Sequence, residues 1–65
     1  MEVNPVRLRQ LREDATLSAR ELAEKAGVHE NTVLRLEGGK GGAHPRTIRK
    51  LAAALGTTPK ELKEK

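Results

Sequence analysis

The fold of this chain is decided by residues 17–28, which read LSARELAEKAGV. The stretch opens with a capping box, because the Ser18 hydroxyl and the Glu21 carboxylate can each accept a hydrogen bond from a backbone N–H that the first helical turn leaves unpaired. Gly27 ends the pattern, since glycine adopts the left-handed conformation that closes many helices. We therefore expect a short helix that begins after Ser18 and stops before Gly27.

A second helix follows almost at once. Only one residue separates Gly27 from residues 29–37, in which Val33 and Leu36 recur at the spacing of an inward-facing stripe. Two helices joined so closely form a tight helix-turn-helix rather than a parallel pair. The small side chain of Ala23 would let the two helices approach each other closely. The pattern therefore predicts a helix-turn-helix unit.

Three further helix starts surround this unit. Each has a proline at the first helical position: Pro5 after the capping residue Asn4, Pro45 after His44, and Pro59 after Thr58. Residues 58–61 also have the T-x-x-E spacing of another capping box. The fourth expected helix has the clearest amphipathic pattern in the chain, formed by Ile48, Leu51, Ala52 and Leu55. We expect an all-α fold, a compact five-helix bundle without strands, in one domain over residues 1–65.

Composition limits the class of function. The 65 residues carry 13 Lys and Arg against 9 Asp and Glu, a net charge of +4, with no Cys and no aromatic residue. So short a chain buries little core for an enzyme pocket, and we see no nucleophile–base pair or carboxylate cluster. We expect no enzyme activity, no cofactor and no small-molecule substrate. His29 and His44 lack companions at ligand spacing, so we expect no metal. Without aromatic side chains to stack on bases, single-stranded nucleic acid is a poor partner.

These segments resemble the phage repressor and Cro-type helix-turn-helix family, also called the XRE type, with its lambda-repressor-like fold. Residues 17–28 carry the likeness to its helix-turn-helix, and residues 47–56, TIRKLAAALG, are similar to its fourth helix. The resemblance covers about residues 5–62, with the helix-turn-helix over about 18–37 and the recognition helix over about 29–37. It implies sequence-specific binding of double-stranded DNA by a transcriptional regulator, most simply a repressor.

The resemblance implies that outward residues of the recognition helix contact base edges in the major groove. Arg35 can donate two hydrogen bonds to guanine, Asn31 can pair with adenine, and Glu30 can accept from cytosine. Leu34 is an outward apolar residue that could meet a thymine methyl group. Each has a simpler alternative: Glu30 would favour the helix dipole, Asn31 and Arg35 would form a solvated face, and Leu34 would cover the rim of the core.

Basic residues gather after the recognition helix. Residues 38–50 contain no acid and four cations, Lys40, Arg46, Arg49 and Lys50. Four glycines among residues 38–43 predict a non-helical loop whose backbone amides can approach a phosphate. We expect phosphate contacts from this region and from the starts of the second and third helices, made by Ser18, Arg20, His29, Lys40, Arg46 and Thr47. The alternative is a run of charges that only keeps the chain soluble.

The resemblance also implies an ion pair between Arg12 in the first helix and Glu37 at the end of the recognition helix, with a structural role. The chain departs from the family at two helix starts. Ala19 stands where a glutamine is usual, and His29 stands where Ser or Thr is usual. Since histidine is a poorer N-cap than Ser or Thr, we expect a weakly capped third helix.

Several points stay open on the sequence. A protein–protein module, such as an antitoxin-like regulatory partner that uses the Leu34 face or the last helix, is the alternative function. The tail after Leu62 has no apolar residue for a dimer surface, so we expect a monomer or a weak homodimer.

Without a membrane-length apolar run or a signal peptide, we expect a cytoplasmic location. The regular caps and aliphatic core are also typical of designed proteins, so natural and engineered origins both fit.

Overall fold

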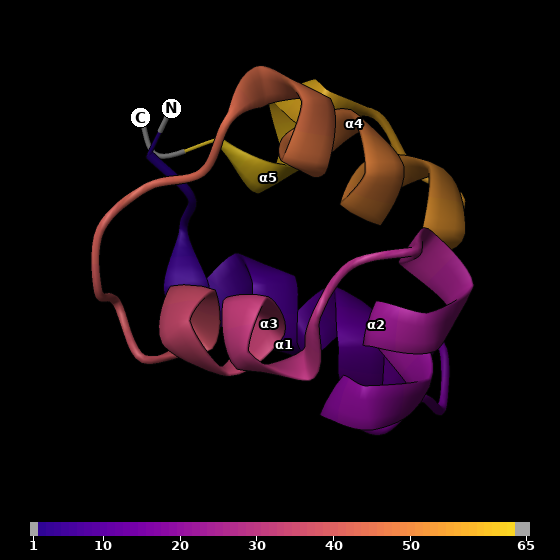
Figure 1. Ribbon diagram of the computed structural model, residues 1–65. Helices are drawn as coiled ribbons and strands as arrows, with labels where there is room; N and C mark the ends of the chain where they lie inside the picture. Colours follow the sequence, from indigo (N-terminus) through magenta and orange to yellow (C-terminus); the bar gives the residue numbers. More distant parts are fainter. Residues whose placement is uncertain (1, 64–65) are drawn as a thin grey trace.

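The computed structural model describes residues 2–63; Met1 and the last two residues of the tail, Glu64 and Lys65, lie outside them. Five helices follow one another (Figure 1), α1 (Pro5–Asp14), α2 (Ala19–Ala26), α3 (Glu30–Glu37), α4 (Pro45–Ala54) and α5 (Pro59–Leu62). No β-strand occurs between residues 2 and 63. The predicted all-α, five-helix fold is confirmed.

The caps of the first two helices form as predicted. The Asn4 side chain accepts a hydrogen bond from the Arg7 N–H at 3.1 Å and so begins α1. At the start of α2, the Glu21 N–H donates to the Ser18 hydroxyl at 3.0 Å, and the Ser18 N–H donates to the Glu21 carboxylate at 2.9 Å. Gly27 ends α2 in the left-handed region, at a φ of 74°. The local chemistry of residues 17–28 therefore fixes α2 and the turn into α3.

The capping box predicted at the start of α5 is wrong. The Thr58 side chain makes no hydrogen bond to the α5 backbone. The Glu61 carboxylate accepts instead from the Arg7 guanidinium in α1, at 2.7 Å. The Glu61 carboxylate therefore joins α5 to α1, and no side chain caps α5.

The two ends of the described chain meet. Val3 forms an isolated antiparallel bridge with Lys63. The Asn4 N–H donates to the Leu62 carbonyl at 2.9 Å, and both Val3 and Leu62 are buried. Figure 1 shows the N- and C-terminal segments side by side. This closure holds the short α5 against the start of α1, and nothing in the sequence pattern predicts it.

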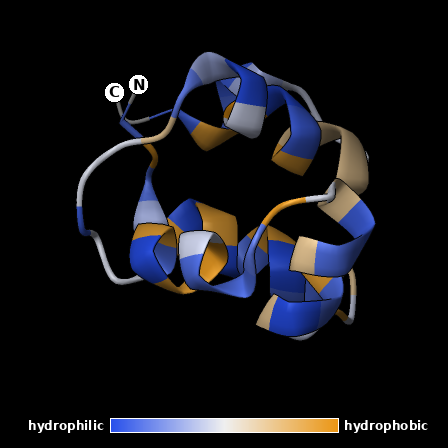
Figure 2. Cartoon of the chain, viewed as in Figure 1, coloured by the Kyte–Doolittle hydropathy of each residue, from blue (hydrophilic) through white to orange (hydrophobic). Residues whose placement is uncertain are grey.

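The core is aliphatic and fixes one face of α3. Helix α2 packs on α3 and α4, α1 packs on α3 and α5, and α4 packs on α5. The largest fully buried side chains are Leu8, Leu22, Val33, Leu36, Ile48, Leu51 and Leu62. Ala23 is also buried, as the close approach of α2 and α3 requires. Figure 2 shows that most of the loop between α3 and α4 is white or blue and so carries little hydrophobic surface. Helix α3 packs against α1 and α2.

The capping box of α2 should make stability depend on pH. Hydrogen bonding to Ser18, through its backbone N–H first and its side chain second, lowers the pKa of Glu21 below that of an ordinary glutamate. A lowered pKa in the folded state stabilises the protein above the unfolded pKa, about 4.3 for glutamate. That stabilisation is lost as the pH falls through the folded value.

We expect Glu21→Gln to remove this contribution, so that the melting temperature of the variant falls less than that of the unmodified chain between about pH 5 and about pH 3. Thermal unfolding followed by circular dichroism measures the difference. Glu24→Gln removes one negative charge from the same helix outside the box and serves as the control. An identical acid-induced fall in Glu21→Gln and the unmodified chain would contradict the assignment.

Candidate functional site

Helix α3 presents one polar face to solvent. Val33 and Leu36 are buried, and the four exposed residues lie on the other side of the helix, at Glu30, Asn31, Leu34 and Arg35. Their spacing places 30 above 34 and 31 above 35, one turn apart. The face combines a carboxylate, an amide, an apolar side chain and a guanidinium, so it can accept and donate hydrogen bonds and make apolar contact at once.

Leu34 is the unusual member of this face. Its side chain is 51% exposed, although it stands among polar residues. Leu11, Leu17 and Leu55 are partly buried and pack against the core, whereas Leu34 is exposed. An exposed Leu at the middle of a polar face offers an apolar surface to whatever binds there.

The N-terminal end of α3 has no side-chain cap. His29 occupies the N-cap position and is exposed, but its side chain makes no cap hydrogen bond. The Thr32 N–H donates to the His29 carbonyl at 3.0 Å. The weak cap predicted from the sequence is confirmed, and the His29 ring is not used to start the helix.

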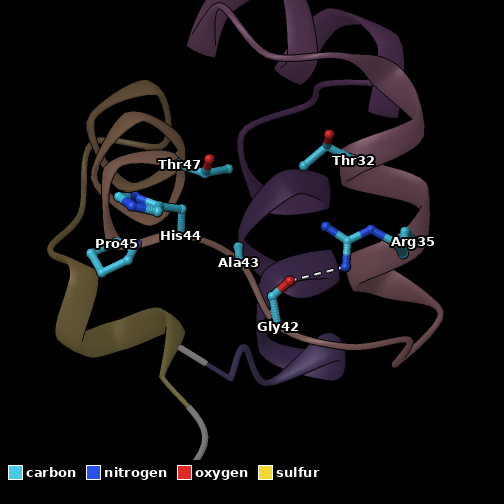
Figure 3. Close-up of a pocket in the computed structure, with 7 residues that line it drawn as sticks. All are labelled: Thr32, Arg35, Gly42, Ala43, His44, Pro45 and Thr47. Carbon is cyan, nitrogen blue, oxygen red and sulfur yellow. Dashed lines mark hydrogen bonds between the residues drawn. The ribbon is translucent and has the colours of Figure 1, made fainter.

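Arg35 extends from α3 to the glycine-rich loop (Figure 3). Its Nη1 donates to the Lys40 carbonyl and to the Gly42 carbonyl, each at 2.9 Å. Its Nε and Nη2 donate no hydrogen bond to any part of the chain from residue 2 to residue 63. Sequence reasoning missed this contact, because a loop of glycines carries no side-chain pattern that names its partner.

A hollow lies between α3 and the start of α4. Figure 3 shows Thr32 and Arg35 on the α3 side, His44, Pro45 and Thr47 on the α4 side, and Gly42 and Ala43 between them. The His44 Nδ1 accepts a hydrogen bond from the Arg46 N–H at 3.2 Å, so His44 caps α4 through its ring. Of the residues predicted to contact phosphate, Thr47 lies across this hollow from Arg35 (Figure 3).

The other cations predicted to contact phosphate are exposed. Neither Lys40 nor Arg46 forms an ion pair with a described residue. The Arg20 guanidinium lies 3.8 Å from the Glu24 carboxylate on the same helix, a weak surface pair. In the view of Figure 1, α2 lies on one side of α3, and the loop between α3 and α4 lies on the other. The predicted phosphate contacts are therefore spread over the start of α2, the N-cap of α3, the loop and the start of α4.

Arg12 and Glu37 form a two-pronged ion pair at the end of α3. The Arg12 Nε and Nη2 lie 2.6 and 2.9 Å from the two Glu37 carboxylate oxygens, and Nη1 donates to the Leu17 carbonyl at 2.9 Å. Their side chains are only 14% and 9% exposed. The hydrogen bond with Glu37 raises the pKa of Arg12. One guanidinium thus joins α1, the turn before α2 and the C-terminal end of α3.

The described part of the chain offers neither a membrane-spanning helix nor a cluster of metal ligands. No helix there has both the length and the hydropathy needed to cross a membrane. No group of three or more His, Asp or Glu residues within residues 2–63 is arranged to hold a metal ion.

Comparison with known proteins places this geometry in a family. The family model of a helix-turn-helix domain matches residues 6–64. The restriction-modification controller protein C.AhdI from Aeromonas hydrophila is 37% identical with a TM-score of 0.85, over 91% of this chain and 89% of its own. The clp gene regulator ClgR from Corynebacterium glutamicum is 28% identical with a TM-score of 0.80, over 88% of this chain and 61% of its own.

Some structural neighbours are much larger than this chain. A hydroxyethylphosphonate dioxygenase is 26% identical with a TM-score of 0.87 over the whole of this chain, which spans only 14% of that enzyme. A search of curated proteins found no match. Since the helix-turn-helix model covers almost all of the sequence and the structure has the corresponding helices, the chain belongs to the helix-turn-helix domain family.

Proposed function

We propose that this chain binds double-stranded DNA in a sequence-specific manner, with α3 in the major groove, and acts as a transcriptional regulator. The observation that carries the proposal is the exposed face of α3, where four chemically different side chains point away from the core. With its side chains an α-helix is about 10–12 Å across, which fits a major groove about 12 Å wide. Family membership and the regulators among the structural neighbours support the same proposal.

Each exposed residue of α3 has a base feature that fits its chemistry. Asn31 would pair with the N6 and N7 atoms of adenine, and Glu30 would accept from cytosine N4. Leu34 would contact a thymine methyl group, the apolar feature of the major groove. Arg35 keeps its Nε and Nη2 edge for guanine O6 and N7, because its loop bonds use only Nη1.

Basic and hydroxyl side chains around α3 would contact the DNA backbone. Lys40, Arg46 and Thr47 would contact phosphates on one side of α3. Ser18 and Arg20 would do so on the other side, with His29 at the start of α3. Contacts of this kind fix the orientation of the helix in the groove and carry no sequence information. The simplest regulatory outcome is repression, through occlusion of the bound site, by a monomer or a weak homodimer.

Selection from a random duplex library, run at two salt concentrations, tests the proposal. We expect enrichment of one short site, and its symmetry would show whether one copy or two copies bind. A library that stays random at both salt concentrations, with binding that is equal for all sequences, would overturn sequence-specific recognition.

Single substitutions should separate base contacts from phosphate contacts. We expect Arg35→Ala to weaken binding to the selected site by about 1–3 kcal/mol and to relax the preference at one base pair. Lys40→Ala also removes one positive charge and serves as the matched variant. It should weaken binding to all duplexes by the same factor. Fluorescence anisotropy with the selected site and its single-base variants measures both. An unchanged base preference in Arg35→Ala would contradict the guanine contact.

A second function has one observation in its favour. The 51% exposure of Leu34 also suits an apolar contact with another protein, as in an antitoxin-like regulatory module. A protein complex that survives high salt, is lost in Leu34→Ala and forms without any shift of duplex DNA would favour this alternative.

A further inference from the structure

We infer that Arg35 is also a positioning residue, which clamps the glycine-rich loop to α3, and that Gly41 is the residue that makes room for the clamp. Three hydrogen bonds join Arg35 to the loop. Its Nη1 donates to the Lys40 and Gly42 carbonyls at 2.9 Å each, and its own carbonyl accepts from the Lys40 N–H at 3.0 Å. Bonds from a charged guanidinium are stronger than those between neutral groups.

Backbone hydrogen bonds hold the first part of the loop, where the Gly38 and Gly39 N–H groups donate to the Leu34 and Leu36 carbonyls. Residues 38–42 place no side chain in the core, and the first buried residue after α3 is Ala43. Glycine loses more backbone freedom on folding than any other residue, so a segment with four glycines is costly to fix in one conformation. The Arg35 bonds to the carbonyls on both sides of Gly41 would therefore help to order the second part of the loop.

The surroundings of Gly41 and Gly39 show which glycine serves the clamp. Both adopt left-handed backbone conformations, with φ of 75° at Gly41 and 72° at Gly39. A Cβ added to Gly41 would lie 3.2 Å from the Arg35 Nη1, closer than most real Cβ contacts. A Cβ added to Gly39 would meet only Pro5 Cγ, at an ordinary 3.6 Å. The two positions thus share the same backbone strain, and only Gly41 adjoins the guanidinium.

The clamp links the face of α3 to the start of α4. By fixing the Lys40 and Gly42 carbonyls, it sets the path of the loop and the width of the hollow between Arg35 and Thr47. A consequence for DNA binding rests on the proposed function. The clamp would hold Lys40 and the start of α4 in position to contact phosphates. Arg35 would then combine two tasks on different edges of one guanidinium.

The clamp itself is tested without DNA. In Arg35→Ala we expect amide hydrogen exchange at Lys40 to become about tenfold faster, which corresponds to about 1.4 kcal/mol of local opening. Gly41→Ala should have a similar effect, and Gly39→Ala a smaller one. In the unmodified chain, NMR of the guanidinium groups should show slowed rotation at Arg35, with the paired Arg12 as the positive control. Unchanged Lys40 exchange in Arg35→Ala would overturn the clamp.

The consequence for DNA is tested with the same variants. We expect Gly41→Ala to weaken the selected site and a scrambled duplex by one shared factor, about three- to tenfold, with base preference unchanged. Gly39→Ala should weaken DNA binding less than Gly41→Ala does. The double variant of Arg35→Ala with Gly41→Ala should bind no more weakly than Arg35→Ala alone. Equal losses for the two glycine variants, or additive losses in the double variant, would overturn the role in DNA binding. If the unmodified chain bound no DNA, the proposed function would fail while the exchange result would still decide the clamp.

Discussion

Arg12→Ala is expected to lower the free energy of unfolding by about 3 kcal/mol, which is a large part of the stability of a 65-residue domain. The substitution leaves the Glu37 carboxylate, only 9% exposed, without its partner. It also removes the donor to the Leu17 carbonyl. An unpaired charge that is shielded from water costs more than a surface pair contributes. Urea unfolding followed by circular dichroism measures the loss.

The chain offers a matched control on the same helix. Arg9 and Glu13 also form an Arg–Glu pair in α1, but their side chains are 65% and 55% exposed. Arg9→Ala should therefore cost at most about 0.5 kcal/mol. The double variant of Arg12→Met with Glu37→Leu removes both charges together and should be more stable than Arg12→Ala. Equal costs for Arg12→Ala and Arg9→Ala would show that the Arg12 pair contributes no more than a surface pair.

Local chemistry explains why the helices could be predicted from the sequence. The caps at Asn4 and Ser18 and the stop at Gly27 each depend on atoms within a few residues along the chain, and all three form as expected. Helical spacing likewise identifies Val33 and Leu36 as buried, and so identifies which side of α3 faces solvent. The composition of the exposed face of α3 was therefore predictable.

Contacts between distant residues could not be predicted in the same way. Arg7 and Glu61 are 54 positions apart, and no spacing rule joins them. The bond from Arg35 to the loop was missed for a related reason. Its acceptors are the carbonyls of Lys40 and Gly42, and every residue has a carbonyl, so residue type gives no signal.

The two ends of α3 are held in different ways, and this difference bears on the site. At the C-terminal end, Arg12 forms an ion pair with Glu37, and Arg35 donates hydrogen bonds to the loop. At the N-terminal end, His29 caps without its side chain. Glu30 and Asn31 thus lie at the end of α3 that has no side-chain cap, and Arg35 lies near the end that side-chain hydrogen bonds join to α1 and to the loop.

Raising the salt concentration from about 50 to about 200 mM should weaken DNA binding about 40-fold. Phosphate contacts by three cations, Arg20, Lys40 and Arg46, give a slope near −2.7 for the logarithm of affinity against the logarithm of salt concentration, because each neutralised phosphate releases a bound counterion. Titrations by fluorescence anisotropy at four or more salt concentrations measure the slope. Lys40→Ala should make it shallower by about one unit.

Leu34→Ala is the matched control for the salt experiment, because it removes apolar contact and no charge. It should lower affinity at every salt concentration and leave the slope unchanged, since a thymine methyl contact releases no counterion. The same pair of variants separates the two candidate functions. A contact with a protein through Leu34 would persist at high salt and would be insensitive to Lys40→Ala. An affinity that does not depend on salt, and that is the same for Lys40→Ala and the unmodified chain, would therefore contradict the proposed phosphate contacts. It would favour the protein partner.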